Sequence, residues 1–161
     1  MPKSTPTDMS EIASIELHTG ASSLETAGGG GGEPVLSPEP FIVPAETVAA
    51  VNLARGNDRP VIAVGTTVVR ALESAWDGHQ VGAASGFTRL FVEPRRGVRT
   101  VDGLITGLHD LNATHLAMLR AIGGERRIAD GYDEAIRAGY LWHEFGDSHL
   151  VLPAAQIGLR R

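Results

Sequence analysis

The 161-residue chain contains no cysteine and no long apolar run. The absence of cysteine excludes disulfide bonds, thiolate nucleophiles and zinc sites with Cys ligands. No apolar stretch approaches the length that crosses a bilayer, and the polar N-terminus lacks the apolar segment of a signal peptide. Together these absences favour a cytoplasmic protein.

Positive charge is also scarce. Lys and Arg number 14 against 19 Asp and Glu, which gives a formal net charge of -5. Phosphate neutralisation supplies most of the affinity of non-specific nucleic-acid binders, so this chain needs a local basic patch, or another chain's surface, to bind RNA. The candidate phosphate contacts are Arg95, Arg96, Arg99, Arg126 and Arg127, although basic pairs of this kind are also ordinary solvated surface.

Length and composition predict one domain with its own core. We expect a disordered tail over 1–10, an α/β domain over 11–153 and a second tail over 154–161. Within the domain, residues 27–40 form a flexible loop rich in Gly and Pro. The alternative is that its glycine run cradles a phosphate, but Glu33-Pro34 follows the run where such loops begin a helix.

Hydrophobic periodicity predicts alternating helices and strands. Val61-Ile62-Ala63-Val64 is continuous, apolar and β-branched, as in a strand buried on both faces of a parallel sheet. The expected fold is therefore α/β, with helices layered around a mostly parallel sheet. The predicted strands are 12–17, 61–64, 87–92, 101–106 and 147–152, and the predicted helices are 44–56, 68–76, 112–122 and 125–138.

Polar residues follow two of these strands at their carboxyl ends, where open α/β sheets bind ligands. Gly65-Thr66-Thr67 joins strand 61–64 to the next helix, whose N-terminal N–H groups favour an anion; alternatively, a Thr hydroxyl caps its own helix. His109 follows the strand at 101–106 and is either functional or a structural histidine. Asp102 lies at the start of that strand.

The segment from His143 to His149 contains residues typical of metal sites. Its two histidines are six apart, whereas the zincin pattern needs two histidines four apart on one helix. On a strand, His143, Asp147 and His149 would share a face and can form a weaker metal site.

Five segments resemble one family, in the same order and at the same spacing. The family is the S-adenosylmethionine:tRNA ribosyltransferase-isomerases. The similar segments are His18–Ala21 (family pattern HVGA), Ala63–Ser74 (AVGTTSVRTLES), Ser85–Pro94 (GWTDLFIxP), Val101–His109 (VDALITNFH), and Tyr132–Ile136 with Tyr140 and Phe145–Asp147 (YxEAI…Y…YGD).

The resemblance implies a reaction and a set of partners. Such enzymes transfer the ribosyl group of S-adenosylmethionine, a co-substrate, to 7-aminomethyl-7-deazaguanine in the tRNA anticodon. They isomerise it to give epoxyqueuosine, with release of methionine and adenine. No metal or other cofactor is implied. The residues that match the family motifs are His109, Asp102 and Arg70 as catalytic candidates, and His18, Gly65, Thr66, Thr67, Glu73 and Asp147 as substrate-binding candidates.

The match covers only the C-terminal half of the family. The N-terminal half and an inserted β-barrel are missing from it, so we expect a homo-oligomer or a complex with a chain that supplies the missing half. Two alternatives remain beside the transferase. The chain can be a truncated, non-catalytic relative that keeps the scaffold, or an α/β domain that binds an unrelated nucleotide.

Overall fold

The computed structural model describes residues 11–20, 36–109 and 115–153. The predicted tails and the glycine run of the 27–40 loop lie outside these residues. In chain order the elements are β1 (Glu16–Leu17), β2 (Glu39–Val43), α1 (Ala45–Gly56), β3 (Ile62–Val64), α2 (Thr66–Ser74), β4 (Ala84–Thr88), β5 (Gly103–Gly107), α3 (His115–Gly123), α4 (Glu125–Arg137), the 3-10 turn η2 (His143–Phe145) and β6 (Ser148–Val151). No helix within the described residues is long and apolar enough to span a bilayer.

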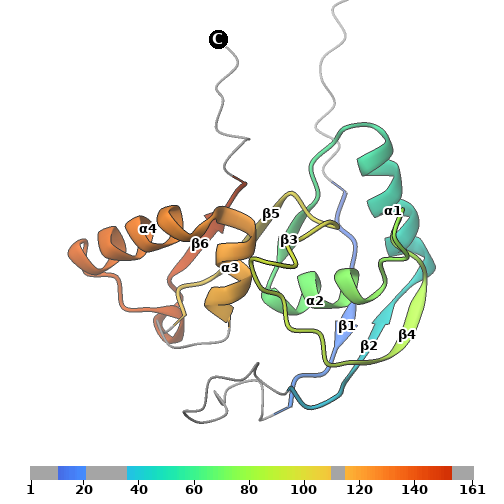
Figure 1. The fold of residues 1–161 in the computed structure, drawn as a ribbon, viewed down its shortest axis with the longest axis horizontal. Helices are drawn as coiled ribbons and strands as arrows, with labels where there is room; N and C mark the ends of the chain where they lie inside the picture. Colours follow the sequence, from blue (N-terminus) through green and yellow to red (C-terminus); the bar gives the residue numbers. More distant parts are fainter. Residues whose placement is uncertain (1–10, 21–35, 110–114, 154–161) are drawn as a thin grey trace, which may run out of the picture.

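The strands form two small sheets (Figure 1). The first has the order β1-β2-β4 and is antiparallel throughout. The second has the order β3-β5-β6, in which β3 and β5 are parallel and β5 and β6 are antiparallel. The predicted α/β class is confirmed.

The prediction of a mostly parallel sheet was wrong for the described residues, where only β3 and β5 pair in parallel. The connections explain the difference. A single crossover helix returns the chain to the same end of a sheet, so the next strand is parallel. Two consecutive helices, α3 and α4, separate β5 from β6, and the extra helix lets the chain return so that β6 runs antiparallel to β5.

Helix α2 lies between the two sheets and supplies the centre of the core (Figure 1). Its residues from Val69 to Glu73 are all buried, and Val69 and Leu72 are among the most enclosed side chains of the described residues. Two of the buried residues, Arg70 and Glu73, are charged, so both need internal partners. The helix that follows Gly65 therefore carries polar groups into the interior.

Strand β2 overlaps the end of the predicted 27–40 loop, so the loop prediction was wrong for Glu39 and Pro40. A proline lacks the N–H that a sheet ladder uses, which argues against a central strand. Here the carbonyl of Pro40 accepts a hydrogen bond from the backbone N–H of His18 at 3.0 Å, just beyond the end of β1. The missing N–H therefore faces the side where the β1 ladder stops.

Strand β4 begins and ends earlier than the predicted strand at 87–92. Beyond Thr88 the ladder is replaced by side-chain contacts. The backbone N–H of Leu90 donates to Thr88 Oγ1 at 3.0 Å, and its carbonyl accepts from Arg70 Nε at 3.1 Å. The chain is turned out of the sheet at this point.

Strand β3 is an edge strand in the described sheet, and it is buried on only one face. Ala63 is fully enclosed, whereas Ile62 and Val64 point to the other side and are exposed. The prediction that residues 61–64 are buried on both faces was therefore wrong within this chain.

Candidate functional site

The site is built where β3 and β5 end. Because these strands are parallel, with Val64 opposite Ile105, their carboxyl ends lie at the same edge of the sheet. The backbone N–H of Gly65 donates to the carbonyl of Ile105 at 2.8 Å, which ties the start of α2 to the end of β5. The topology thus places Gly65 and the segment leading to His109 on one side of the sheet, as the sequence predicted.

Helix α2 begins without a side-chain cap. Gly65 precedes its first turn with φ 95° and ψ 143°, a conformation that side chains rarely adopt. The alternative that Thr66 or Thr67 caps the helix is not supported, because the capping position belongs to Gly65. Thr66 is buried and Thr67 is half-buried. The N–H groups at this helix start remain suited to an anionic group.

Three histidines gather at the same edge, and we call them the histidine row. The rings of His109 and His115 stack with centroids 4.4 Å apart and planes 15° apart. The ring centroid of His143 lies 4.9 Å from that of His109, with the two planes tilted by 42°. His109 follows β5, His115 begins α3 and His143 begins η2, so three elements bring the row together. His109 Nε2 also forms a hydrogen bond of 3.1 Å with Thr106 Oγ1.

The half-buried rings of the histidine row, His109 and His115, are uncharged at neutral pH. Burial, together with the neighbouring charges of His115, His143 and His149, lowers the pKa of His109 to about 4 against the opposing effect of Glu144. Burial also lowers the pKa of His115, with Arg70 and His143 acting in the same direction. A neutral imidazole can accept a proton or a hydrogen bond, which an imidazolium cannot do.

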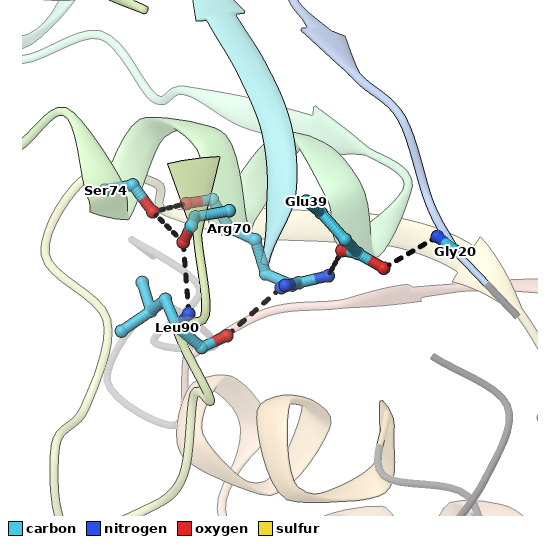
Figure 2. Close-up of polar contacts among 6 residues, drawn as sticks. Gly20, Glu39, Arg70, Ser74 and Leu90 are labelled. Atoms are coloured by element: carbon cyan, nitrogen blue, oxygen red, sulfur yellow. Dashed lines mark hydrogen bonds and ion pairs between the residues drawn. The ribbon is translucent and has the colours of Figure 1, made fainter. Parts of the chain in front are cut away.

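Arg70 lies one turn into α2, and its positive charge contributes to the lowered pKa of His115. Arg70 and Glu39 are 8% and 3% exposed and form a buried ion pair. Figure 2 shows the pair held on both sides. Gly20 N–H donates to Glu39 Oε1 at 3.0 Å, and Arg70 Nε donates to the carbonyl of Leu90 at 3.1 Å.

One nitrogen of the Arg70 guanidinium, Nη2, is buried with no hydrogen-bond partner among the described residues. Unsatisfied buried donors are rare and costly, and they concentrate at functional sites. Glu39 and His115 were not predicted as site residues. Glu39 stands between two prolines in what reads as a loop, and His115 has no sequence motif, so only the folded chain reveals either one.

Asp102 is not part of this site. It precedes β5, at the opposite edge of the sheet from His109, and its Oδ2 accepts a hydrogen bond from the N–H of Val61 at 2.9 Å. The prediction that Asp102 converges with Thr66 and His109 was wrong, because a strand of five residues separates the two edges by roughly 15 Å. Asp102 instead fastens the start of β3 to the start of β5.

Two of the predicted substrate-binding residues, Glu73 and Asp147, form hydrogen bonds that hold neighbouring segments of the backbone in place. Glu73 is buried, and its carboxylate accepts bonds from the Thr100 and Arg99 backbones and pairs with Arg96. Asp147 accepts a bond from the N–H of Leu141 through its carboxylate and one from Leu108 N–H through its carbonyl.

Asp147 thereby holds the turn that carries His143 against the end of β5, where His143 N–H donates to the carbonyl of Leu108 at 2.9 Å. His18, in contrast, has an exposed side chain whose Nε2 lies 3.9 Å from Glu16 Oε2. Of the basic residues, Arg96 is committed to Glu73, while Arg126 lies 3.9 Å from Asp130 on the exposed side of α4.

The proposed metal face at the C-terminal end does not form. His143 lies in η2 and His149 in β6, so no single strand presents them together with Asp147. Within the described residues, no group of three His, Asp or Glu side chains is arranged to hold a metal ion.

The sequence pattern of a family described as "Queuosine biosynthesis protein" matches residues 5–151. The chain belongs to this family.

Relatives within the queuosine biosynthesis family carry a specific name. The chain is 41% identical over 141 residues to the S-adenosylmethionine:tRNA ribosyltransferase-isomerase of Deinococcus radiodurans, covering 88% of this chain and 39% of the relative. It is 38% identical over 143 residues to the protein of that name from Thermus thermophilus, covering 88% of this chain and 41% of the relative. The chain therefore spans about two fifths of the length of these relatives.

A solved structure supports the same fold. The S-adenosylmethionine tRNA ribosyltransferase of Thermotoga maritima superposes with a TM-score of 0.66 at 34% identity, over 71% of this chain and 40% of that chain. Membership in the queuosine biosynthesis family is thus matched by shared architecture in the part that the two proteins have in common.

Proposed function

We propose that this chain carries the ribosyl-transfer site of an S-adenosylmethionine:tRNA ribosyltransferase-isomerase. The reaction would move the ribosyl group of S-adenosylmethionine onto 7-aminomethyl-7-deazaguanine of tRNA, give epoxyqueuosine, and release methionine and adenine. The chain would act together with polypeptide equivalent to the part of the relatives that it does not match. A tRNA substrate places this reaction in the cytoplasm.

The observation that carries the proposal is the placement of the histidine row at the edge where β3 and β5 end, which is also where the helix that carries Arg70 begins. This is where α/β folds bind their ligands. The uncapped start of α2 suits an anionic group such as the carboxylate of the methionine moiety. Thr66 and Thr67 lie in that first turn, and Arg70 follows one turn later.

At neutral pH His109 is in the uncharged form that can accept a proton, although its lowered pKa makes it a weaker base than a free imidazole. An amine that forms a new bond to carbon must lose a proton, and a neutral imidazole can take it. Because Nε2 of His109 is bonded to Thr106, Nδ1 is the nitrogen left for a substrate. Uncharged rings at His109 and His115 also avoid repelling the sulfonium cation of S-adenosylmethionine.

The test uses the chain mixed with the remaining part of the Deinococcus radiodurans relative, produced separately. Adenine release from S-adenosylmethionine is measured in the presence of tRNA that bears the aminomethyl base. We expect His109→Asn to reduce turnover at least ~100-fold with an unchanged melting temperature. His79→Asn is the matched control, because His79 is exposed and lies outside the histidine row.

Two outcomes contradict the proposal. Unchanged turnover in His109→Asn would make His109 a structural histidine. No turnover from a mixture shown to form a complex would favour the alternative, a scaffold that keeps the fold and lacks the chemistry.

A further inference from the structure

One face of the β3-β5-β6 sheet is bare in the described part of the chain. On the covered face, Ala63, Leu104 and Val151 lie opposite one another beneath helices α2 and α3, and all three are buried. On the other face, Val64, Ile105 and Leu150 lie opposite one another across the three strands. Their exposed fractions are 68%, 39% and 55%. Ile62, two residues before Val64 on the same face, is 37% exposed.

This row of side chains is aliphatic and uncharged on all three strands. Contiguous exposed apolar surface of this kind marks an interface, whereas single exposed apolar residues are ordinary. The parallel pairing of β3 and β5 adds to the argument, because parallel strands occur almost only in sheets that are covered on both faces. The outer edge of β3 is also unpaired within the described residues, so it can accept a further strand.

The apolar, uncharged side chains of this face indicate what kind of partner can bind it. It offers no cation for a phosphate, so it is not a surface for RNA. The covered face is packed by helices, and a layered α/β sheet takes helices on its second face as well. The matching partner is therefore an amphipathic helix with an apolar stripe.

The relatives contain polypeptide that can supply such a helix. The relatives share this part of the fold, yet the chain spans only 39% of the Deinococcus radiodurans protein and 41% of the Thermus thermophilus protein. About three fifths of each relative is thus additional polypeptide that accompanies the same sheet.

We infer that the bare face, defined by Ile62, Val64, Ile105 and Leu150, docks the polypeptide equivalent to that additional part, through an apolar helix laid across the three strands. This inference rests on the proposed function only for the identity of the partner. That partner, called the companion below, is the part of the relatives that this chain does not match and that the proposed enzyme requires. The face itself is a property of this chain.

The test exploits the absence of native cysteine in the chain. Val64→Cys places a single thiol on the bare face, and Leu53→Cys places one on α1, where Leu53 is similarly exposed at 60%. Thiol labelling rates of both full-length variants are measured by mass spectrometry, alone and with the remaining part of the Deinococcus radiodurans relative. We expect the companion to slow labelling at position 64 at least tenfold and to leave position 53 unchanged.

A second pair of variants checks the same face by association. Val64→Glu should weaken complex formation in sedimentation at least tenfold, whereas Leu53→Glu should not. Both positions are solvent-exposed in the chain, so a charge there leaves its fold intact.

The inference is overturned if the thiol at position 64 labels equally fast with the companion present, or if no complex forms. It is also overturned if that thiol is protected in the chain alone, with a doubled mass, because a second copy then covers the face. Adenine release in the same mixture separates the two proposals. Protection without release contradicts only the proposed function, and release without protection contradicts only the docking face.

Discussion

Glu73 shows, at the scale of a single residue, how this fold keeps a charge in its interior. The side chain is almost fully buried on α2, and its Oε1 accepts bonds from Arg99 N, Thr100 N and Thr100 Oγ1 at 2.7, 2.8 and 2.9 Å. Burial raises the pKa of Glu73, but these bonds and the pairing with Arg96 outweigh it, so the pKa lies below its usual value. The carboxylate is therefore a structural anchor for the segment that precedes β5.

We expect Glu73→Ala to lower the free energy of unfolding by about 3 kcal/mol, because it leaves several buried donors unpaired at once. Urea unfolding at pH 7.5 measures the loss. Glu134→Ala is the control, since it breaks an exposed ion pair with Arg137 and should cost less than about 1 kcal/mol. Equal losses in the two variants would show that water replaces the buried bonds of Glu73.

At the scale of the element, Gly107 allows the end of β5 to pack closely against the turn that carries His143. A Cβ atom added at Gly107 would lie 2.5 Å from the Cβ of His143, which is closer than such atoms approach. The packing of His143 against the strand end therefore depends on the absence of a side chain at position 107.

We expect Gly107→Ala to destabilise the chain by about 1–3 kcal/mol and to displace His143 from His109. Urea unfolding measures the first effect, and the NMR shifts of the histidine rings report the second. Gly86→Ala in β4 is the matched control, because nothing lies within 4 Å of a Cβ built there. A Gly107→Ala variant with wild-type stability and ring shifts would contradict this packing.

The elements that could be predicted are those whose pattern is local. Helix α1, helix α4 and strand β3 followed from apolar spacing and from Pro44 or Gly139 at their ends. Strand β2 could not be predicted in this way. Its place in the sheet depends on pairing with β1 and β4, which overrides the presence of Pro40.

The site was predictable in part, for the same reason. Two strand ends followed by Gly65 and His109 indicate one sheet edge, provided that the strands are parallel neighbours, and they are. Glu39 and His115 join the site from other elements, and no local pattern encodes a partner 31 residues away, as in the bond between Glu39 and Arg70. The same limit applies to Asp102. Only the observed pairing of β3 with β5 shows that Asp102 lies at the opposite edge of the sheet from His109.

Half-buried histidines make the stability of the whole molecule depend on pH. Burial is the main cause that lowers the pKa of His109 to about 4, and it lowers those of His115 and His149 as well. In the unfolded chain a histidine titrates near its ordinary value, about 6.5. Between these values the unfolded chain binds more protons than the folded one, so acid favours unfolding.

We therefore expect the free energy of unfolding to be constant above about pH 7 and to fall as the pH drops from about 6.5 towards 4, with His109 alone accounting for up to roughly 3 kcal/mol. The lowered pKa of Glu73 acts in the same direction at the acid end, because its stabilising contribution is lost as the carboxylate is protonated.

Urea unfolding at pH 7.5, 6.0 and 5.0 measures how steeply the free energy of unfolding depends on pH. His109→Asn should flatten it by removing one proton-linked group from the folded interior, while the exposed His79→Asn should not. A wild-type curve that is flat from pH 7.5 to 5.0 would mean that the rings titrate as they do in water, and it would contradict the lowered pKa of His109.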